Sequence, residues 1–220
     1  MYSFYYTMSA RIVHYSKSDG QTLADMVCFC ARVSNPANQM NTQKNDGLIR
    51  YLMKHHHWSP FEMVSICIEI RTTRDIARQV LRHRSFSFQE FSQRYAVVEE
   101  EGCIREARLQ NLTNRQSSLE TDDQALHQEW TEIQTRILSQ TKEAYTWALT
   151  HGIAKEQARA VLPEGLTPSV LYMNGTLRSW IHYLQLRTGM DTQKEHRELA
   201  GECLAQIETI FPEIKECFKI

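Results

Sequence analysis

Residues 122–151 constrain the fold more strongly than any other stretch of this chain of 220 residues. Apolar side chains recur there at helical spacing, namely Leu126, Trp130, Ile133 and Ile137. This pattern predicts one long amphipathic helix, and Gly152 supplies a residue suited to its C-terminal cap. A chain of this length with a helix this long has room for one sizeable core.

The rest of the chain predicts few strands and several more helices. Residues 63–71 alternate Val64, Ile66, Ile68 and Ile70 with more polar residues, which predicts a half-buried strand, and a short strand is expected at 10–15. Further helices are expected at 22–33, 46–56, 176–187 and 193–210, with a short one ending at Leu162. Long helices with few strands favour the α+β class over repeated βαβ units. We therefore expect a single domain over residues 1–220, with an antiparallel or mixed sheet flanked by long helices.

Composition and charge exclude several classes of protein. The chain is 42% hydrophobic and 23% charged, which excludes collagen-like and broadly disordered sequences. The formal net charge is -1, so the chain carries no global excess of positive charge for nucleic acid or membrane surfaces. Any site for an anion must therefore be concentrated locally.

The cysteines and the N-terminal residues indicate in which cellular compartment the protein is expected. Six cysteines form no CxxC pair, so we interpret them as reduced core residues rather than as metal or redox sites. Residues 1–13 lack the basic patch and apolar run of a secretory signal, and no stretch is long and apolar enough for a membrane helix. We expect a cytoplasmic protein.

Positive charge is concentrated between Arg71 and Arg94, where six arginines face only Asp75 and Glu90. An expected helix in this region places Arg74, Arg78 and Arg82 on one face. Arginine without lysine suits bidentate binding of phosphate or carboxylate. The alternative is a solvated charged face with no ligand.

The segment that follows, residues 82–95, mixes donors, aromatic rings and one carboxylate. We find neither helical nor strand periodicity in it. Its aromatic residues are Phe86, Phe88, Phe91 and Tyr95. Flat apolar faces beside arginines suit a nucleotide or a flavin.

The same segment resembles the signature of the flavin-dependent thymidylate synthases, Arg-His-Arg followed by seven residues and a serine. This chain matches it from Arg82-His83-Arg84 to Ser92 and continues into Arg94-Tyr95. The resemblance extends to residues 31–34, 51–62, 158–163 and 177–183. It covers most of the chain.

The resemblance implies an activity and its cofactors. In this family FAD passes a hydride from NADPH, methylenetetrahydrofolate supplies a carbon, and dUMP becomes dTMP. The enzyme is usually a homotetramer with sites between subunits. We expect no nucleic-acid or membrane partner and no bound metal.

The resemblance also implies roles for individual residues. Positions that match FAD contacts are Ser59, Arg82, His83, Arg84, Glu90, Thr176, Arg178 and His182. Positions that match dUMP contacts are Gln79, Arg82, Glu90, Phe91, Ser92, Gln93, Arg94, Arg159 and Arg187, with Arg159 coming from another subunit. His57 is expected to help position folate or nicotinamide, or else to be a helix-terminal residue. Thr176 and His182 stand where many members carry Asn, and Asn174 is a candidate substitute for the lost amide.

Arg187 stands out from the sequence itself. On the expected helix 176–187 it lies beside Trp180 and Leu184, at the border of the apolar face. A guanidinium held there beside a pyrimidine would stabilise negative charge on the ring, the role that the resemblance also implies. The alternative is an arginine that snorkels at a helix end.

Other chemistries remain as alternatives. His55, His56 and His57 lack the i, i+4 spacing of zinc ligands on a helix. Ser92 has no base at a fixed offset to activate it as a nucleophile, so we expect it to orient or polarise dUMP. A flavin reductase without methyl transfer and an RNA-binding protein with stacking aromatics are the two rival functions. No Gly-x-Gly-x-x-Gly element marks an NADPH site.

Overall fold

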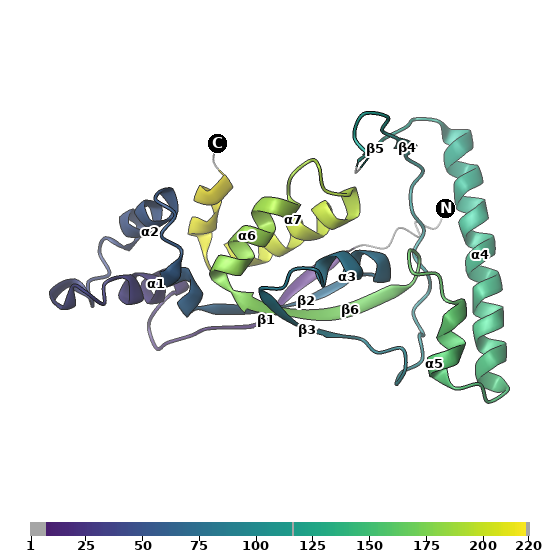
Figure 1. The fold of residues 1–220 in the computed structure, drawn as a ribbon, viewed down its shortest axis with the longest axis horizontal. Helices are drawn as coiled ribbons and strands as arrows, with labels where there is room; N and C mark the ends of the chain where they lie inside the picture. Colours follow the sequence, from purple (N-terminus) through teal and green to yellow (C-terminus); the bar gives the residue numbers. More distant parts are fainter. Residues whose placement is uncertain (1–7, 116, 219–220) are drawn as a thin grey trace.

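A sheet of four antiparallel strands forms the centre of the computed structural model, which describes residues 8–115 and 117–218. The strands lie in the order β1-β2-β6-β3 (Figure 1). Their bounds are Ser9–Tyr15 for β1, Ser65–Thr73 for β2, Phe86–Glu90 for β3 and Pro168–Thr176 for β6. The α+β class and the antiparallel sheet are confirmed. The parts of our expectations that concern residues 1–7 and Gln116 lie outside the described residues.

Two of the four strands differ from the sequence prediction. The sequence predicted no strand at β6, yet β6 is central and pairs with both β2 and β3. The description of 82–95 as aperiodic was wrong over β3, where Phe86, Phe88 and Glu90 turn inward and Ser87 and Gln89 are exposed. A five-residue strand offers too few repeats for period two to stand out among arginines and aromatics.

The helices lie close to their predicted positions. Their bounds are Leu23–Ala31 (α1), Asn45–Lys54 (α2), Arg74–Val80 (α3), Gln124–Thr150 (α4), Lys155–Ala158 (α5), Leu177–Arg187 (α6) and Lys194–Glu208 (α7). Short 3-10 helices occupy Pro36–Asn38 (η1), Ser59–Met63 (η2), Arg159–Val161 (η3) and Pro212–Phe218 (η4), and a small hairpin pairs β4 (Leu109–Gln110) with β5 (Ser118–Leu119). Gly152 follows α4 with a φ of 79°, as expected of a residue that ends a helix. Helix α3 is shorter than expected, so Arg82 lies beyond its end and does not share a helix face with Arg74 and Arg78.

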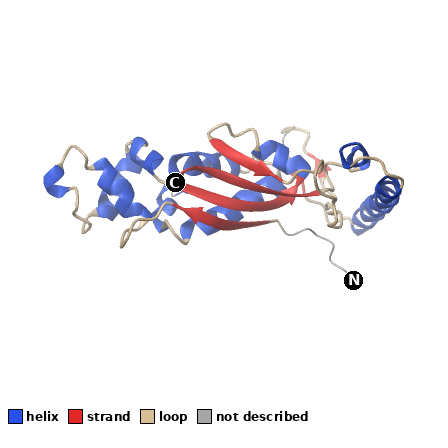
Figure 2. Ribbon diagram, turned by 90° about the horizontal axis from the view of Figure 1, so that it is seen from below, coloured by secondary structure: helices blue, strands red, loops and turns tan. Residues whose placement is uncertain are grey.

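The main core lies between the sheet and the helices on one of its faces. Ile66, Ile68 and Ile70 of β2 are fully buried, as are Trp180 and Tyr183 of α6. Among residues 8–115 and 117–218, helices cover this face, and the strands are open to view from the other side (Figures 1 and 2). The expected arrangement of helices beside the sheet is therefore present on one face of the sheet.

Helix α4 stands at one end of the molecule, beside α5 (Figure 1). A small second cluster joins the two through Tyr145, Ala148 and Ala158. Leu126, Trp130 and Ile137, on whose spacing α4 was predicted, are not buried in this chain. They are 36%, 39% and 41% exposed.

The six cysteines are all free thiols. Cys28, Cys67, Cys103 and Cys203 are buried, and the other two are half-buried. The burial of four of them agrees with the interpretation as core residues, and their reduced state stays a prediction.

Gly175 allows β6 to pass the ring of Phe86. A Cβ at residue 175 would lie 2.4 Å from Cδ1 of Phe86, whose ring is held edge-on against Trp180 at a centroid distance of 5.0 Å. We expect Gly175→Ala to lower the free energy of unfolding by about 1–3 kcal/mol, because overpacking forces side chains or backbone to move. Urea denaturation measures this loss.

Gly201→Ala is the matched control, because Gly201 lies in α7 and a Cβ at this residue would meet no atom within 4 Å. Alanine should raise stability there by up to about 1 kcal/mol through helix propensity. Equal effects of the two substitutions would contradict the packing argument.

Candidate active site

Glu90, at the end of β3, is held by two arginines of α3 and a serine of β6. Its carboxylate lies 3.3 Å from Arg74 and 3.6 Å from Arg78, and Ser169 donates a hydrogen bond of 2.9 Å to it. Burial lowers the pKa of Arg74, Glu90 opposes that shift, and the cations of Arg78 and Arg159 add to it. The protein's own carboxylate therefore pairs with Arg74 and Arg78, a contact that neither the ligand-binding nor the solvated interpretation of this face included.

The arginines that come after α3 are different. Arg82, Arg84 and Arg94 are exposed, and no carboxylate among residues 8–115 and 117–218 forms an ion pair with them. Arg159 donates to a backbone carbonyl, that of Glu156, at 3.3 Å. These four guanidinium groups are available to an external anion.

Arg187 meets His83 across the space between α6 and the turn that follows α3. Its Nε donates to Nε2 of His83 at 3.0 Å. Since an arginine only donates, His83 must accept with Nε2 and carry its proton on Nδ1. Burial and the Arg187 cation lower the pKa of His83 to about 4, so the ring is neutral at neutral pH. The sequence placed Arg187 at the border of the apolar face, and the structure shows it half-buried there.

The residues after β3 provide polar groups near the chain's unpaired arginines. Ser92 is half-buried and Phe91 is exposed. Gln93 is 4% exposed, and its Nε2 has no hydrogen-bond partner among the described residues. A buried amide donor without a partner is the expected state of a group that binds a ligand.

The remaining predicted FAD residues gather around the start of α6. Arg178 forms an ion pair with Glu62 of η2, which is the helix that begins with Ser59. Thr176 caps α6 by accepting from the backbone N–H of Ser179 at 3.2 Å. On β6, Asn174 has a buried Oδ1 with no partner among the described residues, so it offers an unpaired amide where Thr176 does not.

His57 and His182 are both exposed. His57 follows the C-terminus of α2, with its ring 5.8 Å from that of Tyr51, and His182 adds to the lowering of the pKa of His83. Within the described residues, no group of three or more His, Cys, Asp or Glu side chains is arranged to hold a metal ion.

The structure does not bring all predicted site residues together within one chain. Helix α2 and α5 lie at opposite ends of the molecule (Figure 1). Ser59 and His57 follow α2, whereas Arg159 follows α5. One small ligand cannot contact both groups in a single subunit.

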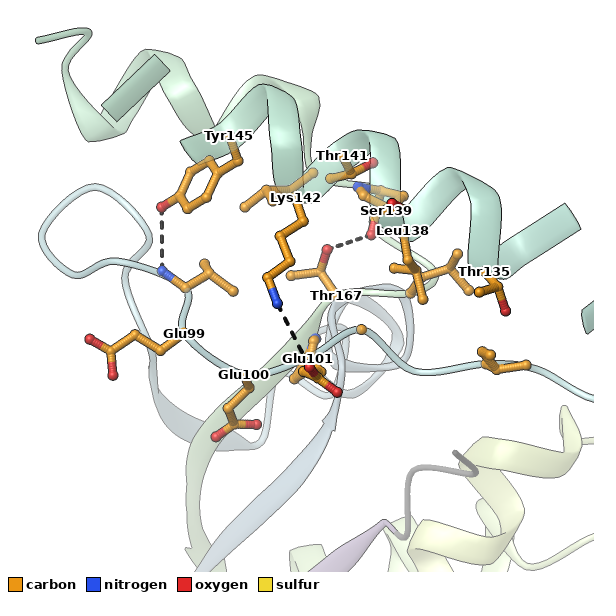
Figure 3. A pocket seen from close by; sticks show the side chains of 17 residues that line it. Glu99, Glu100, Glu101, Thr135, Leu138, Ser139, Thr141, Lys142, Tyr145 and Thr167 are labelled. Carbon is orange, nitrogen blue, oxygen red and sulfur yellow. Dashed lines mark hydrogen bonds and ion pairs between the residues drawn. The ribbon is translucent and has the colours of Figure 1, made fainter. Parts of the chain in front are cut away.

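A cavity of about 330 Å³ lies elsewhere, between α4 and the loops at 98–104 and 162–168 (Figure 3). Tyr145 accepts from the backbone of Val98 at 3.3 Å, and Lys142 lies 3.7 Å from Glu101 across its mouth. None of the predicted site residues lines it. The candidate site is therefore the region of α3, β3 and α6.

Residues 11–213 match the family model described as thymidylate synthase complementing protein. The chain belongs to this family. A probable flavin-dependent thymidylate synthase of Paramecium bursaria Chlorella virus 1 is 47% identical over 213 residues, covering 94% of this chain and 97% of the relative. The flavin-dependent thymidylate synthase of Synechocystis sp. is 47% identical over 184 residues, covering 83% of this chain and 84% of the relative. The resemblance stated from the sequence is confirmed.

A solved structure extends the likeness to the fold. The UMP/dUMP methylase PolB of Streptomyces cacaoi, bound to 5-Br dUMP, has a TM-score of 0.80 and 30% identity, covering 96% of this chain and 94% of that one. Its complex with 5-Br UMP has a TM-score of 0.83. Neither the flavin reductase nor the RNA-binding alternative is supported by these comparisons.

Sequence reasoning missed several residues of this thymidylate synthase family member that lie under the candidate site. These are Tyr183, Gln193, Glu195 and His196. The sequence did carry a signal for one of them. His196 shares the apolar face of α7 with Leu199, Ala200 and Cys203, and the structure shows it fully buried. A lone histidine on such a face requires buried partners.

The two buried histidines make the stability of this family member depend on pH. Burial, Arg187 and His182 lower the pKa of His83 from 6.5 to about 4, and burial, Arg187 and His83 lower that of His196 to about 3. In the unfolded chain both bind protons below pH 6.5, so unfolding takes up protons and stability falls as the pH drops from 6.5 towards 4. We expect close to two protons to be taken up on unfolding at about pH 5.

Urea denaturation between about pH 7 and pH 5.5 measures this uptake, at pH values where carboxylates are mostly ionised. His196→Gln should remove about one proton of the uptake. Tyr183→Phe is the control, because it deletes a hydrogen bond to His196 and leaves both imidazoles in place. An unchanged pH dependence in His196→Gln would contradict the assignment.

Proposed function

We propose that this protein catalyses the reductive methylation of dUMP to dTMP, with FAD as cofactor, methylenetetrahydrofolate as carbon donor and NADPH as reductant. The observation that carries the proposal is the pairing of Arg187 with neutral His83, next to the unpaired Arg82 and Arg84 in sequence. That arrangement offers cations for phosphates and a half-buried cation for a ring that gains negative charge. The names of the relatives and the dUMP analogue bound to the structural neighbour support the same substrate.

The residues present fit a flavin nucleotide. Arg82 and Arg84 supply donors for its phosphates, and Asn174 and Gln93 supply buried polar atoms without partners among the described residues. Ser59, Arg178 and His182 are the further candidates to hold it. The chemistry that bound FAD supplies is the transfer of a hydride from NADPH to the one-carbon unit.

The chain's own residues then bind and polarise dUMP. Arg94, and Arg159 of another subunit, bind the phosphate. Arg187 stabilises negative charge on the uracil ring as the carbon adds, because its cation is fixed in a partly buried position where water screens it poorly. Ser92 orients the ring by hydrogen bonding, without forming a covalent bond to it. His57 helps position folate or nicotinamide.

A homotetramer with sites between subunits accounts for the residues that one chain keeps apart. Ser59 and Arg159 flank opposite ends of the molecule, so a second subunit must supply one of them. The apolar stripe of α4, with Leu126, Trp130 and Ile137 partly exposed, offers a surface for that contact. No helix among the described residues is long and apolar enough to cross a membrane, and a cytoplasmic location stays a prediction.

Anaerobic spectroscopy tests the proposed function. The visible spectrum of the protein with FAD is recorded, NADPH is added with and without dUMP, and methylenetetrahydrofolate is added last before analysis for dTMP. We expect bleaching of the flavin and formation of dTMP. Bleaching without dTMP would indicate a reductase, and failure to bind FAD would overturn the cofactor assignment and favour the RNA-binding alternative.

A further inference from the structure

Five side chains form a continuous hydrogen-bonded chain beneath the candidate site, which we call the Glu195 relay. Its members, in spatial order, are Glu195, Gln193, Gln79, His196 and Tyr183. The successive donor–acceptor distances are 2.9 Å, 2.8 Å, 3.1 Å and 3.2 Å. The relay links α7 and the residue before it with α3 and α6.

The carboxylate of Glu195 sets the direction of every bond. It is 7% exposed and lies between Arg105 and Arg108, whose charges outweigh the cost of burial and lower its pKa to about 2. An ionised carboxylate only accepts, so Gln193 must donate to it with Nε2. The carbonyl of Gln193 then faces Gln79, which must donate in turn with its own Nε2.

This direction decides the tautomer of His196. The carbonyl of Gln79 faces Nδ1 of His196, so that nitrogen carries the proton. Burial, Arg187 and His83 keep the ring neutral, with a pKa of about 3, so Nε2 is an acceptor. The hydroxyl of Tyr183, whose pKa burial raises, donates to it. Each hydrogen bond of the relay therefore has only one possible choice of donor and acceptor.

The relay leaves one group free to recognise a ligand. Gln79 is half-buried, and its Nε2 makes one of its two donations among the described residues. With its carbonyl held by His196, the amide presents an N–H rather than an oxygen on its remaining side. An N–H recognises a carbonyl oxygen, such as those of a uracil ring, and an oxygen there would repel it.

We propose that His196 is a positioning residue. Gln193 sets which way the Gln79 amide points, and the Nδ1–H of His196 holds its carbonyl in place, so that the free N–H of Gln79 binds a carbonyl oxygen of the pyrimidine. The proposal rests on the proposed function, because it takes dUMP as the ligand of Gln79. His196 itself touches neither substrate nor cofactor. Through Gln79 it affects the affinity for the pyrimidine and the orientation of the bound ring.

Two substitutions of the same residue separate this role from a structural one. In His196→Asn an amide N–H takes the place of Nδ1–H and keeps the bond to Gln79, while the contact with Tyr183 is lost. In His196→Gln the amide reaches the position of Nε2, and the bond to Gln79 is lost. Both variants remove the imidazole, and thermal unfolding measures how much stability each variant loses relative to the wild type.

The measurement is the dissociation constant for dUMP of the FAD-loaded protein by calorimetry, together with the KM for dUMP and kcat. We expect His196→Gln to raise the dissociation constant and KM about five- to tenfold, the effect of losing one hydrogen bond, with a smaller change in kcat. His196→Asn should stay within about twofold of the wild type. Tyr183→Phe, which leaves the bond between His196 and Gln79 intact, should behave like His196→Asn.

The outcomes distinguish the proposal from the function on which it rests. Equal dissociation constants for the Asn and Gln variants would overturn the positioning role, whatever their stability. A dissociation constant that follows the loss of stability across the three variants would also overturn it. If the wild-type protein with FAD does not bind dUMP at all, the proposed function fails before the variants are compared.

Discussion

Arg187→Lys is expected to lower kcat about 100- to 1,000-fold, the loss typical when a fixed group that stabilises charge in the transition state is removed. Lysine keeps the positive charge but lacks the rigid fork that lets Arg187 donate to His83 from Nε at 3.0 Å while its terminal nitrogens face the ring. The ammonium group would therefore be free to turn away from the ring. The dissociation constant for dUMP should rise much less than kcat falls, because the charge on the uracil develops only as the reaction proceeds.

Steady-state kinetics and dUMP titration of the same preparations measure the two quantities. Arg11→Lys is the matched control, since Arg11 lies on the open face of the sheet, 2.9 Å from Glu69, and should leave kcat unchanged. If Arg187→Lys were to turn over at the wild-type rate, charge alone would suffice and the fixed geometry with His83 would have no catalytic role.

Mixing two inactive variants should restore activity if each site is built from more than one subunit. Arg159→Ala removes the arginine that we propose the neighbouring subunit contributes to the phosphate, and Arg187→Ala removes the arginine beside His83. After subunit exchange at equal amounts, about one site in four would combine an intact Arg187 with an intact Arg159. We expect roughly a quarter of the wild-type rate from proteins that are almost inactive alone.

The control mixture pairs Arg187→Ala with Arg82→Ala. Arg82 precedes His83, which bonds Arg187 in the same chain, so both defects fall in the part of the site made by one subunit. No combination of these subunits gives an intact site, and the mixture should remain inactive. Recovery in both mixtures, or in neither, would argue against a site shared between subunits.

The sequence predicted the local elements well and the pairing of distant ones poorly. Helix α4 begins and ends within about two residues of the expected range, because its spacing and its terminating glycine are local features. Strand β6 escaped prediction because Pro163, Gly165 and Gly175 suggest a loop around a short apolar run. What makes that run a central strand is its pairing with β2 and β3, which are distant in the sequence.

The same limit applied to the arginines of the candidate site. Composition identified the cluster, and the family motif identified the residues that match FAD and dUMP contacts. The sequence could not show that Arg74 and Arg78 pair with Glu90, since that pairing requires β3 to lie beside α3. Nor could it show the relay from Glu195, whose members come from three separate parts of the chain.

The position of β3 at the edge of the sheet lets the segment that carries the signature open more easily than the central strands. The strand joins the sheet through β6 alone, and the motif residues extend from both of its ends. Opening this segment would break one ladder of backbone bonds and withdraw Phe86 from the core, but it would leave the pairing of β2 with β6 intact. Amide hydrogens of β3 should therefore exchange faster than those of β2. The segment that carries the signature can therefore move with its ligands at the cost of one strand ladder and the packing of Phe86, while β2 and β6 stay paired.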